Sequence, residues 1–167
     1  MKNCRGFGGF TMVEMMAVIA VISILALMAI PSYLDRIVKA QIEAALPLAE
    51  IAKNPVAVFW GATHAMPADN AATALPVADK IVNNHVSALT VRDGVIDLTF
   101  GNRANKAIAG KILSLRPAVV EDAPVVPIAW VCGFAEVPTK MTAMGENRTN
   151  VDPLYLPIEC RSLKPRS

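Results

Sequence analysis

The sequence predicts an α+β protein, in which a long N-terminal α-helix packs on a small four-stranded antiparallel sheet and a disulfide closes a C-terminal loop. Three observations predict this fold. An apolar run near the amino end has the length of a helix that crosses a bilayer. An amphipathic pattern with helical period follows it directly. Further along, two alternating segments flank Asp93-Gly94, a strong β-hairpin signal.

Residues 10–30 form the apolar run and contain one charged side chain, Glu14. As a helix the run spans roughly 31 Å, the thickness of a bilayer core. Lys2 and Arg5 precede it and favour a cytoplasmic amino end, so the rest of the chain is expected to face outward. A secretory signal peptide fits less well, because the run is long, contains a carboxylate and lacks a following small-residue cleavage site. We therefore expect a retained membrane half of the helix over residues 10–31.

From Ser32 the pattern becomes amphipathic, with apolar residues at helical spacing and charged residues on the opposite face. The apolar set is Leu34, Ile37, Val38, Ile42, Ala45 and Leu48. From the pattern we expect the helix to continue to about residue 53, and the amphipathic half as a whole is assigned to residues 32–60. Pro31 and Pro47 each remove a backbone donor, so a kink is expected one turn before each of them.

The remainder of the chain divides into a loop, a sheet and an irregular end. Residues 61–86 hold Gly, Pro, Asn and Asp throughout and are expected to connect helix to sheet. The sheet is assigned to residues 87–132, and residues 133–167 are expected to be irregular and closed by a disulfide. The four expected strands are 87–92, 95–100, 112–116 and 128–132.

The cysteine count gives a reason to expect removal of the first residues. Of Cys4, Cys132 and Cys160, only two remain if residues 1–9 are lost, and an even count suits an exported protein. A Cys132–Cys160 bridge would contribute roughly 3.5 kcal/mol by the chain-entropy argument. The alternative is two buried free thiols in a cytosolic protein, against which the membrane segment argues.

The residues at the start of the apolar run indicate a function. A carboxylate in a membrane helix costs about 2.5–3.5 kcal/mol at central positions and less near the ends, so Glu14 requires a partner. Cleavage after Gly9 would create one, because the new α-amino group of Phe10 is a cation near neutral pH. Between chains, Glu14 of one copy would pair with the Phe10 amine of its neighbour and set the axial register of stacked helices. The alternative is a glutamate that extends to the membrane surface.

This stretch, from Gly8 through Glu14, resembles the precursors of type IV pilins. In those proteins a short basic leader ends in Gly and the mature chain begins with a motif like Phe-Thr-Leu-Ile-Glu. By this resemblance residues 1–9 are a prepilin leader, Phe10 is the residue that becomes N-methylated, Glu14 is the acid needed for assembly, and Pro31 is the proline usual in the helix. A cut after Gly6 is rejected, since it would put Thr11 at the position of the acid.

The resemblance continues beyond the helix and spans nearly the whole chain. Residues 67–72 resemble the loop between helix and sheet, and residues 100–111 resemble the sheet region of major pilins. Residues 130–133, followed by 155–161, resemble the disulfide region. Two departures are the prolines at 47 and 55 within the expected helix and the Pro-rich stretch 121–127.

The resemblance implies a structural subunit of a pilus, or fimbrium. A prepilin peptidase cleaves and methylates it at the inner membrane, and copies of the chain then bundle their helices as the core of an extracellular filament. Motor ATPases and an assembly platform act indirectly, and the filament serves twitching motility, cell adhesion or DNA uptake. A pseudopilin of a type II secretion system and a minor pilin share the leader and remain alternatives.

No other chemistry is indicated. The two histidines are isolated, no nucleophilic set or phosphate loop occurs, and no metal, cofactor or enzymatic activity is expected. The formal charge of +2 becomes zero without Lys2 and Arg5, so nucleic acid is not indicated as a partner. The basic tail with Arg161, Lys164 and Arg166 is the one segment that offers nucleic acid a contact.

Overall fold

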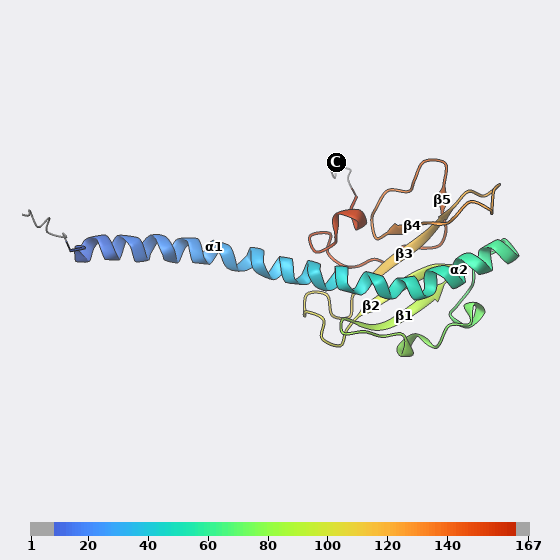
Figure 1. The fold of residues 1–167 in the computed structure, drawn as a ribbon, viewed down its shortest axis with the longest axis horizontal. Coiled ribbons are helices and arrows are strands. Elements are labelled where there is room, and N and C mark those ends of the chain that lie inside the picture. Colours follow the sequence, from blue (N-terminus) through green and yellow to red (C-terminus); the bar gives the residue numbers. More distant parts are fainter. Residues whose placement is uncertain (1–8, 163–167) are drawn as a thin grey trace, which may run out of the picture. The chain divides into compact units, whose positions relative to one another are not determined.

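The computed structural model describes residues 9–162, with backbone only for residues 28–32. The chain divides into two compact units, Met1–Asp35 and Arg36–Ser167, which are described separately. The leader residues 1–8 and the tail residues 163–167, with the features predicted for them, lie outside the described residues. Figure 1 shows the fold. Helix α1 covers Met12–Ala45, and its residues from Arg36 onward belong to the second unit.

The helical region of the second unit changes form at Pro47. After α1, a 3₁₀ helix covers Leu46–Ala49, and helix α2 covers Glu50–Thr63. Proline cannot donate the backbone hydrogen bond of an α-helix and its ring clashes with the preceding turn, so the tighter 3₁₀ geometry lies at Pro47 itself rather than one turn earlier. At Pro31 the backbone of α1 remains α-helical.

The helical region ends later than the amphipathic pattern predicts. Helix α2 continues to Thr63, so an end near residue 53 is wrong. His64 then terminates the helix in the left-handed conformation, with φ of 54°, and its backbone N–H donates to the Trp60 carbonyl at 2.9 Å. Pro55 lies within α2 without ending it, and buried Val56 and Trp60 extend the apolar face past it.

One buried stripe runs along the helical region of the second unit and continues in phase through the 3₁₀ turn. Its members recur every three or four residues and are almost fully buried, because they pack on the sheet. They are Val38, Ile42, Ala45, Ala49, Ala52, Val56 and Trp60. Five of the seven are alanine or valine, and these small side chains let the helical region approach the sheet closely.

The four predicted strands form and pair in the antiparallel order β1-β2-β3-β4. They are β1 (Val86–Arg92), β2 (Val95–Phe100), β3 (Ile112–Val119) and β4 (Ala129–Cys132). The predicted hairpin is confirmed, since Arg92 pairs with Val95 across Asp93-Gly94. Asp93 and Gly94 have φ of 48° and 79°, the two positive values that a two-residue turn with matching twist requires.

The segment predicted to be irregular adds a fifth pairing to the sheet. Strand β5 (Thr142–Ala143) pairs with the end of β3, at Val119 and Ala118. Beyond it, the Asn150 N–H donates to the Ile112 carbonyl at 3.1 Å. Two residues of strand carry no alternating pattern, so the sequence does not predict β5. The C-terminal segment is therefore held to the sheet by backbone hydrogen bonds as well as by the disulfide.

The core of the second unit lies between the buried helical stripe and one face of the sheet. Large side chains that are almost fully buried supply that face, among them Leu89, Ile96, Leu98, Phe100 and Leu113. The edge strand β1 is covered by the loop that follows the helix. Asn70 there accepts from the Val91 N–H at 2.6 Å and donates to the Leu89 carbonyl at 3.0 Å. These bonds satisfy an edge that would otherwise be open to pairing.

The other face of the sheet carries a polar cluster that receives the C-terminal segment. Asp97, which is 5% exposed, accepts from the Ser114 hydroxyl at 2.5 Å and lies 3.4 Å from the Arg92 guanidinium. The Ser114 hydroxyl in turn accepts from the Arg148 backbone N–H at 3.0 Å. Arg92 also donates to the Glu146 carbonyl at 3.2 Å. The cluster holds residues 146–148 against β2 and β3.

Candidate functional site

The amino end of α1 is closed by a reciprocal cap between Thr11 and Glu14. The Thr11 backbone N–H and hydroxyl donate to Oε2 of Glu14 at 2.9 and 2.8 Å, and the Glu14 N–H lies 3.3 Å from the Thr11 hydroxyl oxygen. This is the capping box of a Thr-x-x-Glu sequence, which satisfies backbone donors that a helix start leaves free. The cap fixes the first turn directly after Gly9 and Phe10, and it holds the Glu14 carboxylate at the helix end.

The first unit exposes apolar side chains on every side of its helix. Every side chain described in residues 10–27 is exposed, and Phe10 and Met12 are 75% and 86% exposed. The Ser23 hydroxyl donates a hydrogen bond to the Ile19 carbonyl at 2.8 Å and so needs no partner outside the helix. Glu14 is the single charged residue of the segment 10–30. A helix that is apolar all round is stable in water only when another apolar surface covers it.

Among the residues that the structure describes, no helix combines the length and the hydropathy needed to cross a membrane. The membrane half expected for residues 10–31 therefore remains a prediction. Cleavage after Gly9, methylation of Phe10 and the assembly roles of Glu14 and Pro31 remain predictions too.

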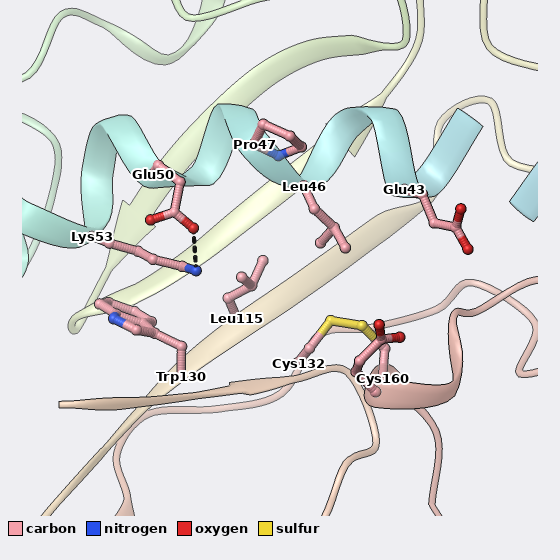
Figure 2. A pocket seen from close by; sticks show the side chains of 10 residues that line it. Glu43, Leu46, Pro47, Glu50, Lys53, Leu115, Trp130, Cys132 and Cys160 are labelled. Carbon is pink, nitrogen blue, oxygen red and sulfur yellow. Dashed lines mark hydrogen bonds and ion pairs between the residues drawn. A yellow bond between two sulfur atoms is a disulfide. The ribbon is translucent and has the colours of Figure 1, made fainter. Parts of the chain in front are cut away.

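A second feature is an open cleft between the helical region and the disulfide, within the second unit. The predicted bridge is confirmed, because Cys132 and Cys160 are joined with their Cα atoms 4.6 Å apart. The cleft has a volume of about 390 Å³. As Figure 2 shows, Leu46, Leu115 and Trp130 face the space between the helical ribbon and the strands, and the disulfide lies at one end. The interior of the cleft is thus mainly apolar.

The rim of the cleft is acidic. Glu43, Glu50 and Glu159 line it together with a single cation, Lys53. The Lys53 ammonium lies 2.6 Å from Oε1 of Glu50 and is largely covered, whereas the Glu50 side chain is 65% exposed (Figure 2). The charges of Lys53 and Glu50 cancel one another. Glu43 and Glu159 therefore give the rim a net charge of −2.

The carboxy-terminal turn beside the cleft is ordered by Arg161. Its guanidinium donates to the Leu156 carbonyl at 2.7 Å and to the Leu154 carbonyl at 2.9 Å. The sequence places Arg161 in a basic tail, and the structure shows in addition that this side chain makes two hydrogen bonds within its own unit. Its charge stabilises the turn that carries Cys160.

The histidines and acids of the described residues do not gather into a metal site. No group of three or more His, Cys, Asp or Glu side chains within that part of the chain could hold a metal ion. His64 lies at the end of α2 and His85 before β1, so the structure keeps the two histidines on different elements.

Comparison with known proteins assigns the family. A family model described as pilin, a bacterial filament protein, matches residues 38–161. The type IV major pilin protein PilE1 of Neisseria gonorrhoeae is 35% identical over 160 residues, which covers 92% of this chain and 86% of that one. The chain belongs to the pilin family. Fimbrial protein EcpC of Eikenella corrodens is 33% identical to this pilin, covering 92% of the pilin and 90% of EcpC. A fimbrial protein of Neisseria meningitidis serogroup B is 29% identical, covering 95% and 96%.

This pilin is a structural subunit of a bacterial filament. Thr11 was not singled out from the sequence, although the Thr-x-x-Glu pattern signals it. The cleft rim was missed because Glu43, Glu50 and Glu159 come from segments that only the fold brings together.

Proposed function

We propose that this pilin is made as a precursor, cleaved after Gly9 by a prepilin peptidase, N-methylated at Phe10 and polymerised through its N-terminal helix. Before assembly the inner membrane holds it by residues 10–31, with the amino end in the cytoplasm. After assembly it forms an extracellular type IV pilus. Copies of the chain are its main partners, and the assembly platform and motor ATPases act on it indirectly.

One observation carries the proposal. The helix begins with a capped turn directly after Gly9 and Phe10, and Glu14 is the one charged side chain among its exposed apolar residues. Outward-facing apolar side chains on all sides suit lipid before assembly and the interior of a helix bundle afterwards. Moving between these two surroundings changes the solvation of the helix little. Glu14 is then the one group that requires a charge partner, and the Phe10 amine of a neighbouring copy has the required sign.

Glu14 caps the start of its own helix, and this role is compatible with pairing to a neighbouring chain. Its carboxylate accepts two hydrogen bonds from Thr11, both on Oε2. A carboxylate has room for about four acceptor contacts, so Oε1 stays available to a second chain. The cap and the pairing with a neighbour therefore do not exclude one another. The cap holds the carboxylate where a stacked helix can reach it.

The second unit, Arg36–Ser167, would serve motility, adhesion or DNA uptake at the filament surface. A pseudopilin of a type II secretion system is the nearest alternative, and a minor pilin that primes or tips the filament is the second. The disulfide-closed C-terminal region, together with the major pilins among the relatives, favours the pilin proper.

Sheared surface filaments test the proposal. We expect this chain to be their most abundant protein. Filaments that lack the chain, combined with loss of protein export on its deletion, would establish the pseudopilin instead. Presence at a few copies per filament, with filaments lost on deletion, would indicate a minor pilin.

A further inference from the structure

The acidic rim of the cleft holds two carboxylates without a partner among the described residues. Glu43 and Glu159 are exposed and make no ion pair there, whereas Glu50 is paired with Lys53. The interior beneath them is apolar, with Trp130 and Leu115 on one side and Leu46 on the other (Figure 2). Such a site suits an alkyl chain that ends in a cation. The stem would cover the apolar interior, an aromatic face would attract the charge, and the carboxylates would pair with it.

A complementary surface lies on the connection between β2 and β3, residues 101–111. It carries three exposed cations, Arg103, Lys106 and Lys111, none of which makes an ion pair within the described residues. No acid occurs between Asp97 and Glu121, so nothing in this stretch offsets the positive charge.

The basic connection is held in a fixed conformation. Its Asn105 N–H donates to the side chain of Gln41 on α1 at 2.8 Å, and Ile108 inserts fully into the core. The Ala104 and Lys111 N–H groups close turns within it, donating to Gly101 and Ile108 at 2.9 Å each. An ordered loop loses little conformational entropy on binding, so its cations are prepared for a contact.

We propose that the basic β2–β3 connection of one copy docks on the acidic cleft of a neighbouring copy in the filament. In Figure 1 the connection and the disulfide-closed turn lie on opposite sides of the helical region of their unit. A contact between two different surfaces of identical subunits is head-to-tail, and it continues indefinitely when the rotation does not close a ring. This is the symmetry of a filament, and the inference rests on the proposed function.

The contact contributes little to the affinity between copies. Its main effect is to fix how the second unit of one copy is aligned with the second unit of the next. Exposed ion pairs contribute little each and weaken with salt, whereas the opposite charges exclude wrong registers, in which like charges would meet. The apolar helices supply the main attraction. The docking should therefore be sensitive to charge reversal and to ionic strength.

Zero-length crosslinking of intact sheared filaments tests the contact. A carbodiimide joins a carboxylate to an amine only where the two touch, and we expect links from Lys106 or Lys111 to Glu43 or Glu159. They should appear as a ladder of covalent oligomers on a denaturing gel and as linked peptides by mass spectrometry. Because the Phe10 amine and Glu14 of neighbouring copies could also be joined, the decisive signal is the set of lysine–glutamate peptides recovered from the oligomer bands. These peptides should disappear in the double variant Lys106→Gln, Lys111→Gln and persist in Lys80→Gln, a control with an exposed lysine outside both surfaces.

Charge reversal gives a second, independent readout. Glu159→Lys and Lys106→Glu should each lower the yield of filaments about threefold, the size of one exposed pair, and the combination should restore it. Filaments that contain the chain but show none of these links, or links from the cleft to another protein, would overturn the docking and leave the proposed function standing. Absence of the chain from filaments would overturn both.

Discussion

Replacing Glu14 with Gln separates the two roles of this carboxylate, the helix cap and the charge. Glutamine keeps an acceptor oxygen at the position that receives the Thr11 N–H and hydroxyl, at 2.9 and 2.8 Å, and Gln serves a capping box as Glu does. Glu14→Val removes both the cap and the charge, whereas Glu14→Gln removes the charge alone. In an apolar stack of helices an ion pair is screened only weakly, so its loss outweighs the loss of two capping hydrogen bonds. If pairing with the neighbouring amine drives assembly, the charge term dominates.

The account therefore predicts that Glu14→Gln and Glu14→Val both leave cleavage intact and both abolish most filaments. Thr11→Val, which removes the hydroxyl and keeps the charge, should lower the yield only severalfold. The assay is the amount of the chain in sheared filaments, with cleavage followed by mass spectrometry of the cell-bound pool. Glu121→Gln, an exposed carboxylate after β3, serves as the control. Normal filaments from Glu14→Gln would refute the charge argument and leave the cap as the sole role of Glu14.

Three further predictions concern the second unit. Cys132→Ala should lower the free energy of unfolding by roughly 3.5 kcal/mol, since the bridge spans 28 positions. Spread over residues 36–167, this is a fall in Tm of about 13 °C by calorimetry. Ile42→Ala, at a position that is 0% exposed, should cost about 2–5 kcal/mol in denaturant titration, and a loss below 1 kcal/mol would contradict the assigned core. Asp97→Ala should cost about 2–3 kcal/mol, because it leaves the buried Ser114 hydroxyl without its acceptor and removes the buried carboxylate beside Arg92, while Asp97→Asn should cost less. Equal losses in the two Asp97 variants would argue against a charge-assisted cluster.

The helix and hairpin could be predicted from the sequence because their signals are local. The amphipathic period from Val38 to Ala45 matches the buried stripe, and Asp93-Gly94 forms the turn it predicts. The end of the helix could not be placed, since Val56 and Trp60 continue the stripe beyond the prolines that suggest a stop. Burial against the sheet there outweighs the low helix propensity of proline.

The C-terminal region illustrates what a sequence leaves open. The cysteine parity predicts the bridge, but nothing local predicts strand β5 or the cluster around Asp97. Both depend on residues from distant segments meeting on the sheet. The acidic cleft is of the same kind, because its carboxylates become neighbours only when α1, α2 and the turn at Cys160 come together.

The central claim is that proteolysis creates a positive terminus at Phe10, which neutralises Glu14 in a stack of apolar helices. Mass spectrometry of the amino terminus of the chain, purified from sheared filaments, tests it most directly. The account predicts a chain that begins with N-methylated Phe10. A filament-borne chain that still begins at Met1, or at any residue other than Phe10, would contradict it.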